Sequence, residues 1–174
     1  MKRLVVYIVL GFIFVSGFSQ EEVNWLGIEE AEKLAKQKPK PLFVDVYTTW
    51  CGWCKRMDRD TFDNPVIAKI LNEKFYPVKF NAESSKAVTF KGNSYKNINA
   101  EKGYRGKHQL TNELLRKARG YPSFALYTLN LEHYHVLQGY LKPAQIEPIL
   151  EYVGDNLYMT TKYEDFLKKF KTRL

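Results

Sequence analysis

Two cysteines, Cys51 and Cys54, are the only cysteines of this 174-residue chain, and their spacing is the feature best suited to chemistry. They lie in the stretch Trp-Cys-Gly-Trp-Cys-Lys at residues 50–55, after an apolar run at residues 42–47 that is typical of a buried strand. The residues that follow are compatible with a helix. At the start of a helix, unpaired amides and the helix dipole favour a thiolate on the first sulfur. We therefore predict that Cys51 attacks a disulfide and that Cys54 resolves the mixed disulfide.

Three other uses of the cysteine pair fit the sequence less well. A purely structural disulfide would close a very short loop and would do little to restrict the unfolded chain. Zinc needs four ligands, and the pair supplies only half of them; His133 and His135 would fall on one face of a strand, but the rest of a ligand pattern is absent. Attachment of a c-type haem requires histidine after the second cysteine, where Lys55 stands. We expect no metal and no other cofactor.

The N-terminus has the pattern of a secretory signal peptide. Residues 1–3 are Met-Lys-Arg, residues 4–15 are apolar, and small residues precede Gln20, the expected first mature residue. An uncleaved membrane anchor is the alternative, but the apolar run is short for the roughly 20 residues that span a bilayer. No cysteine follows the run to accept a lipid. We predict a signal peptide at residues 1–19 and a periplasmic or secreted protein without a transmembrane anchor after cleavage.

Composition favours one globular domain. Hydrophobic residues make up 45% of the chain and aromatic residues 15%, which is enough for a sizeable core. The formal charge is +8, but the basic residues are scattered along the sequence and form no dense run. We interpret them as a solvated basic surface rather than a nucleic-acid site, and we expect a monomer.

Apolar periodicity and turn residues predict the order of elements. Asp63-Asn64-Pro65 predicts a helix start, with Pro65 at the first helical position and an acidic or amide cap before it. In chain order we expect a helix at 25–36, a strand at 42–47, a helix to about 60, a helix from 65, a strand at 76–80, a loose Gly/Asn/Lys-rich stretch at 84–109, a short helix at 110–118, a hairpin with strands at 124–128 and 133–137, and helices at 143–156 and 162–171.

This order, joined to the Trp-Cys-Gly-x-Cys-Lys motif, resembles the thioredoxin superfamily over about residues 25–157. Tyr121-Pro122 is similar to the dipeptide whose cis bond faces the cysteines in that family, and Gly139 matches a glycine before the last helix. Residues 40–47 and 61–66 look most like exported members such as the C-terminal domain of DsbD-type thiol:disulfide interchange proteins. The resemblance implies an α/β fold: a three-layer α/β/α sandwich with a central mixed sheet at residues 20–174, with an extended insert before the cis-proline and an extra C-terminal helix.

The resemblance also assigns a buried acid and its partner. Asp45 lies six residues before Cys51, where thioredoxins carry an acid beneath the second cysteine, and Lys79 ends the next strand near it. A buried Asp45 would take the proton from Cys54 as a general base, with its own pKa raised by desolvation. The alternatives are a polar residue at a strand end for Asp45 and a solvated strand residue for Lys79.

Four further residues are candidates for substrate binding. Trp50 would shield the disulfide and pack against partner peptides, although core packing is the alternative. Trp53 replaces the proline that is usual between thioredoxin cysteines. Pro122, with Tyr121, would expose backbone groups to a substrate strand, unless it is an ordinary trans turn proline.

Two functions from different classes remain. The first is an exported thiol–disulfide oxidoreductase that reduces or exchanges protein disulfides and is served by an unidentified redox partner protein. The second is a redox-inert thioredoxin-fold module that binds peptides or acts like a chaperone. The residues between the cysteines carry no charge, which favours a reductant or exchange catalyst over a strong oxidant. The insert at 84–109 is either a docking surface or a solvated loop.

Overall fold

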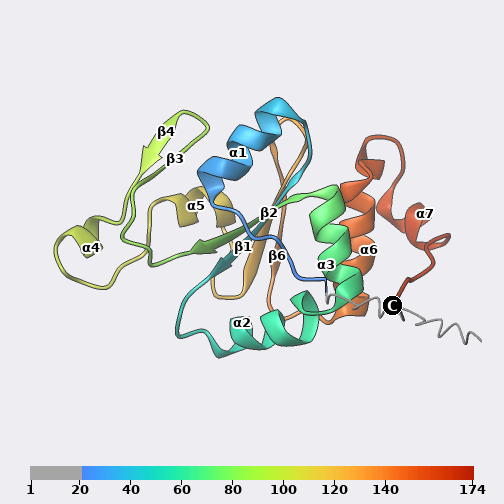
Figure 1. Cartoon of the computed structure of the whole chain (residues 1–174), viewed down its shortest axis with the longest axis horizontal. Coiled ribbons are helices and arrows are strands. Elements are labelled where there is room, and N and C mark those ends of the chain that lie inside the picture. The colour runs from blue at the N-terminus through green and yellow to red at the C-terminus, as the bar shows by residue number, and fades with distance from the viewer. Residues whose placement is uncertain (1–20) are drawn as a thin grey trace, which may run out of the picture.

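The computed structural model describes residues 21–174, so the signal peptide expected at residues 1–19 lies outside the described residues. A four-stranded sheet with the order β2-β1-β5-β6 forms the centre (Figure 1). Its strands are β1 (Leu42–Tyr47), β2 (Tyr76–Asn81), β5 (Ser123–Tyr127) and β6 (His133–Gln138). β1 is parallel to β2, whereas β5 is antiparallel to both of its neighbours. The predicted mixed sheet is confirmed.

Helices cover both faces of this sheet. α1 (Ile28–Gln37) and α5 (Leu110–Leu115) pack on one face, against alternate residues of β1 such as Leu42 and Val44. On the other face, Phe43 packs against α3 (Pro65–Lys74), α6 (Pro143–Gly154) and the helix that follows the cysteines. That helix is α2 (Gly52–Met57), and it continues as a π-helical turn, η1 (Asp58–Phe62). The result is the three-layer α/β/α sandwich that the sequence predicts.

The sequence predicted the start of α3 correctly but placed the start of α1 too early. Asn64 Oδ1 accepts from the amide of Val66 at 2.9 Å, with Pro65 at the first helical position, as predicted. The predicted helix start at residue 25 is wrong, because the chain there joins the sheet instead. The amide of Leu26 donates to the Pro77 carbonyl at 2.8 Å, so α1 begins only at Ile28.

The insert at residues 84–109 is not the loose stretch expected from its composition. It forms a hairpin of β3 (Val88–Phe90) and β4 (Asn93–Tyr95), followed by a short helix, α4 (Ile98–Glu101). Lys91 and Gly92 connect the two strands with φ of 52° and 77°, the positive values that a tight two-residue hairpin turn requires. Phe90 is fully buried with its ring 5.5 Å from that of Tyr127, which ties the hairpin to the core.

The extra C-terminal helix is present but shorter than predicted. α6 is followed by a 3₁₀ turn, η2 (Leu157–Met159), and by α7 (Tyr163–Leu167) rather than a helix over 162–171. Beyond α7 the chain turns back to the buried carboxylate of Glu147, which accepts from Thr172 Oγ1 at 2.5 Å and from the amide of Arg173 at 2.6 Å. Residues beyond Leu167 therefore contact this buried acid instead of completing the predicted helix. Within residues 21–174, no helix is long and apolar enough to cross a membrane.

The two histidines of β6 do not share a face, so that expectation was wrong. The register shifts between Leu126, which pairs with His135, and Tyr127, which pairs with His133. Tyr134 is the extra residue of this bulge, so His133 and His135, which are two residues apart, face opposite sides of the sheet. His133 therefore packs on Tyr127, and its Nε2 lies 2.9 Å from the Leu114 carbonyl. The described residues contain no group of three or more potential metal ligands.

Candidate active site

Cys51 and Cys54 form a disulfide at the N-terminal end of α2, with their Cα atoms 5.3 Å apart. Their exposed fractions, 5% and 3%, do not distinguish the two residues. A hydrogen bond does: the amide of Cys54 donates to Cys51 Sγ at 3.0 Å. In the reduced protein the same amide would stabilise a thiolate on Cys51, because a charged acceptor strengthens a hydrogen bond from a helix N-terminus.

An aromatic cleft adjoins the disulfide. It has a volume of about 340 Å³ and is lined by Trp53, Tyr121, Pro122, Gly139 and Tyr140. The Tyr121-Pro122 peptide bond is cis, as predicted. The Pro122 carbonyl accepts from the amide of Gly139 at 2.9 Å, so β5 and the turn after β6 meet here. The cleft has the size and the apolar lining to receive side chains of a bound peptide.

Trp53 stands at the rim of this cleft and is 55% exposed. The Arg56 guanidinium lies 5.3 Å from the Trp53 ring and 5.3 Å from the Tyr140 ring. Asp60 accepts from Arg56 Nε and from the Tyr140 hydroxyl, each at 3.1 Å. Trp53 is therefore held in place by cation–π contact even though solvent reaches much of it.

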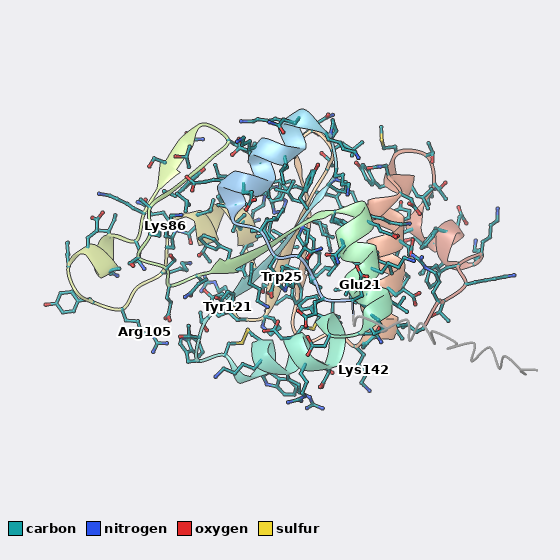
Figure 2. The ribbon with its side chains drawn as sticks, viewed as in Figure 1. Glu21, Trp25, Lys86, Arg105, Tyr121 and Lys142 are labelled. Carbon is teal, nitrogen blue, oxygen red and sulfur yellow. A yellow bond between two sulfur atoms is a disulfide. The ribbon has the colours of Figure 1, made fainter. Side chains whose placement is uncertain are left out.

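Trp50 stands before the disulfide and is held in a similar way. Its indole nitrogen donates to Glu83 at 2.9 Å, and its ring meets that of Tyr121 edge-on at 6.2 Å. Arg105 of the insert binds the same Glu83 carboxylate at 2.7 and 3.1 Å and places its guanidinium 5.1 Å from the Trp50 ring. Figure 2 shows Arg105 and Tyr121 near the start of α2. The insert thus reaches the edge of the dithiol site.

A charged group lies on the sheet face that α2 and η1 cover. Asp45 is 1% exposed, and its Oδ2 is 2.8 Å from Lys79 Nζ. Lys79 also pairs with Asp58, whose amide donates to the Cys54 carbonyl one helical turn back. Asp45 Oδ1 has no hydrogen-bond partner among residues 21–174. Burial raises the pKa of Asp45 to about 6, against the opposing effect of Lys79.

A route to the surface lies at the lysine end of this group. Lys79 Nζ is 4.7 Å from the ring of Trp25 and 5.5 Å from that of Phe62. These residues and Asp58 help to line a surface hollow of about 310 Å³. The buried Asp45 is therefore linked to solvent through Lys79 and Asp58 rather than sealed inside the sheet.

The structure arranges the eight predicted site residues in two layers. The outer layer surrounds the cysteines, and the inner layer holds Asp45 and Lys79 under the α2–η1 helix. Sequence reasoning missed the residues that fix these layers: Arg56, Asp58, Asp60, Glu83 and Tyr140, together with the role of Arg105. The pairs of Asp58 with Lys79 and of Glu83 with Arg105 join distant segments, which no local motif marks. The Arg56–Asp60 pair has the i, i+4 spacing of a helical ion pair, a signal that could have found it.

Fold and site together define a thioredoxin-fold domain that carries a cysteine pair at a helix start. Comparison with known proteins agrees, since the thioredoxin-like domain family matches residues 28–154. The chain belongs to this family.

Individual relatives match a smaller part. An uncharacterised protein of Caenorhabditis elegans is 40% identical over 55 residues, 32% of this chain and 8% of that protein. The thiol:disulfide interchange protein DsbD of Vibrio vulnificus is 36% identical over 58 residues, 30% of this chain and 10% of that protein. The chain therefore spans a small fraction of either relative. A thioredoxin from Thermus thermophilus has the same fold, with a TM-score of 0.55 at 18% identity over 76% of this chain and 87% of that one.

Replacing Asp45 should change how the stability of the oxidised protein depends on pH. The folded-state pKa of Asp45, about 6, lies above its ordinary value of 3.8, so the folded protein holds a proton that the unfolded chain has lost between these values. The free energy of unfolding of the parent should fall as pH rises through this window. Asp45→Asn removes that fall. The free energy of unfolding of the variant, relative to that of the parent, should therefore increase by about 3 kcal/mol between about pH 3 and pH 7. Urea unfolding across this range measures the difference.

The matched control is Asp165→Asn, which removes an exposed acid that pairs with Lys168 on α7. The pH-dependent gap should be absent there. A gap of equal size in both variants would contradict the burial of an unfavourable charge at Asp45.

Arg105→Gln should release the Trp50 side chain. Glu83 then loses the cation that orients its carboxylate, and the indole loses its covering guanidinium. In two-dimensional NMR the Trp50 indole N–H resonance, assigned with Trp50→Phe, should shift and gain fast motion. Lys86→Gln removes a charge from the same insert and should leave this resonance in place. An unchanged indole signal in Arg105→Gln would show that Glu83 alone holds Trp50.

Proposed function

We propose that the protein is an exported thiol–disulfide oxidoreductase that reduces or exchanges disulfide bonds of other proteins. The observation that carries this proposal is the Cys51–Cys54 disulfide at the start of α2, whose first sulfur accepts an amide hydrogen bond. Export is supported by the signal-peptide pattern at residues 1–19 and by similarity to a segment of DsbD. A family fold alone would not carry the activity; the intact cysteine pair does.

The chemistry proceeds through two exchanges. The Cys51 thiolate attacks a client disulfide, forms a bond to one client sulfur and releases the other as a thiolate. Cys54 then loses its proton and attacks Cys51 Sγ, which closes the intramolecular disulfide and releases the second client thiol. The client gains two electrons and the dithiol loses two. A separate redox partner protein must return these electrons before the next cycle.

Asp45 is our proposed acceptor for the Cys54 proton. Its raised pKa makes it a stronger base than an ordinary aspartate, and its unpaired Oδ1 leaves a lone pair open. Lys79 and Asp58 connect it to the surface hollow, through which the proton returns to solvent. Asp58 is one helical turn beyond Cys54. It pairs with Lys79, and its amide donates to the Cys54 carbonyl, so it joins this proposed proton route to the helix that carries the cysteines.

Substrate binding is assigned to the aromatic cleft. Tyr121-Pro122 and Trp53 line it, and the Trp50 ring lies 6.2 Å from the ring of Tyr121. The same cleft supports the alternative function, a redox-inert module that binds peptides through aromatic contacts without exchanging disulfides.

Mixed-disulfide trapping tests the assignment of the two cysteines. Cys54→Ser should accumulate covalent complexes with client proteins, because attack by Cys51 still occurs and resolution does not. Cys51→Ser should trap none. Asp45→Asn retains both cysteines but should slow resolution about a hundredfold near neutral pH, and so prolong the lifetime of the complex. Non-reducing electrophoresis of quenched reactions measures each species.

Glu73→Gln is the control for Asp45→Asn, since Glu73 is an acid on the surface of α3 that pairs with Lys69. Its complexes should resolve at the parent rate. Equal trapping by the two serine variants, or by neither, would overturn the assigned roles.

Two measurements test the redox role: equilibration with glutathione buffers gives the reduction potential, and an insulin-reduction assay separates the two candidate functions. Gly52 and Trp53 offer no charge to stabilise a reduced thiolate, so we expect a potential near the reducing value of about −270 mV known for thioredoxin. A potential near about −120 mV would instead identify a strong oxidant. If the protein binds a peptide but does not reduce insulin disulfides, the redox-inert module is the better description.

A further inference from the structure

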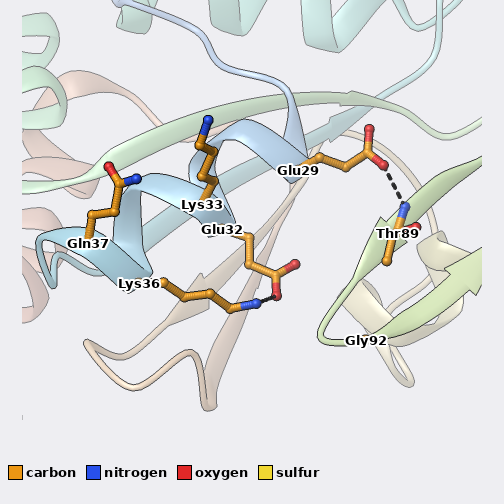
Figure 3. Close-up of a pocket in the computed structure, with 7 residues that line it drawn as sticks. All are labelled: Glu29, Glu32, Lys33, Lys36, Gln37, Thr89 and Gly92. Atoms are coloured by element: carbon orange, nitrogen blue, oxygen red, sulfur yellow. Dashed lines mark hydrogen bonds and ion pairs between the residues drawn. The ribbon is translucent and has the colours of Figure 1, made fainter.

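The insert at residues 84–109 is firmly anchored to the rest of the fold at its hairpin end. Glu29 of α1 accepts from the amide of Thr89 at 2.9 Å (Figure 3). Glu32 accepts from the amide of Lys91 at 3.0 Å. The hollow of about 450 Å³ between them is a seam rather than a site, because both of its carboxylates already have partners: Glu29 accepts from Thr89, and Glu32 pairs with Lys36 at 2.6 Å.

Two buried polar residues anchor the other half of the insert. Asn97 is 1% exposed and donates to the carbonyl of Gly106 at 2.6 Å. His108 is fully buried: its Nδ1 accepts from the amide of Leu110 at 3.1 Å, and its Nε2 lies 3.1 Å from the Lys86 carbonyl. The loop between these anchors is therefore fixed to the fold at both ends. A surface that is already ordered loses little entropy when it binds a partner.

This ordered loop touches the dithiol site at one point. Arg105 binds Glu83 and covers the Trp50 ring, so the loop surface continues into the aromatic rim beside Cys51. A chain bound at the disulfide can extend directly onto the insert.

The surface that it would meet is strongly basic. The insert carries six basic residues and a single acid, Glu101. Glu101 is paired with Lys96 at 3.2 Å, and Arg105 is paired with Glu83. Lys102 and Lys107 are exposed, and neither has an ion-pair partner within residues 21–174. Tyr104 lies between them in the sequence and is 72% exposed. Lys102, Tyr104 and Lys107 are thus all exposed on the loop that Arg105 joins to Trp50, and we call these three residues the basic and aromatic patch.

We propose that this patch is a recognition surface for an acidic segment of the client protein, lying next to the disulfide that Cys51 attacks. The proposal rests on the oxidoreductase function and deepens it by naming the chemistry of the preferred client. Charge complementarity selects the occupant, since aspartate and glutamate side chains would meet unpaired lysines while an aromatic neighbour packs on Tyr104. Continuity with Trp50 places that segment on the same client chain as the disulfide, which favours a protein over a nucleic acid.

The test compares two synthetic peptides that share one internal disulfide and differ only in their flanks, which carry three Glu or three Gln residues. The reduced mature protein should reduce the Glu peptide about tenfold faster at low salt, and the preference should shrink at about 0.5 M salt. Lys102→Gln combined with Lys107→Gln should lower the preference three- to tenfold, in line with the roughly twofold to fivefold effect of each exposed charge pair. The double variant with Glu at both positions should favour a Lys-flanked peptide instead.

Lys169→Gln combined with Lys171→Gln is the matched control. These exposed lysines near the C-terminus carry the same charge but lie beyond α7, on the opposite side of the molecule from the insert in Figure 1. The control should keep the parent preference. Every rate is divided by that for bis(2-hydroxyethyl) disulfide, a small neutral substrate that does not reach the patch.

The outcomes separate the two proposals. If the parent reduces the small disulfide but treats both peptides alike, the recognition surface is overturned and the oxidoreductase function stands. If it reduces none of the disulfides, the oxidoreductase function itself is wrong. If the lysine pair and its control lose the preference equally, net charge rather than the patch is responsible. Binding of a single-stranded oligonucleotide that competes with the Glu peptide and is lost in the Lys102/Lys107 variant would assign the patch to nucleic acid.

Discussion

The buried carboxylate of Asp45 is the constraint on which the site depends. An unpaired charge in the interior is costly. The register of the central sheet provides a partner, because it places Lys79 of β2 directly beside Asp45 of β1. A slip of one residue in this pairing would turn Lys79 to the other face of the sheet and leave the acid alone. Because Lys79 also holds Asp58, the same interaction fixes the helix that begins at the disulfide.

In the exposed part of the site, the aromatic side chains reach solvent but are held by neighbouring arginines. Trp53 lies under Arg56, and Trp50 lies under Arg105; each arginine is in turn held by an acid, Asp60 or Glu83. Ordered aromatic surface binds a peptide at a lower entropic cost than mobile surface of the same area. The rim therefore acts as a preformed contact, and the insert is part of its support.

The sequence predicted what depends on neighbours in the chain. The cysteine motif, the Asn64 cap and the Pro122 turn are local, and the structure contains all three where expected. The sequence did not reveal the Glu83–Arg105 contact, because these residues are 22 positions apart and the segment between them has a composition typical of a loop. The β3–β4 hairpin was missed for a related reason: its strands are three residues long, and their burial depends on Tyr127, far along the chain.

The two proposed roles, proton transfer by Asp45 and client recognition by the insert, fall on separate elements, and this separation has a consequence for how the site would work. Burial raises the pKa of Asp45 to about 6, and Lys79, which also pairs with Asp58, opposes this effect only in part. A pKa near neutrality suits the proposed acceptance of a thiol proton. That balance is set on the sheet face beneath α2. The proposed recognition patch is on the insert, which contacts the site through Arg105 over the Trp50 ring. On these proposals, substitutions of Lys102 and Lys107 should change which proteins are preferred while Asp45 keeps its environment.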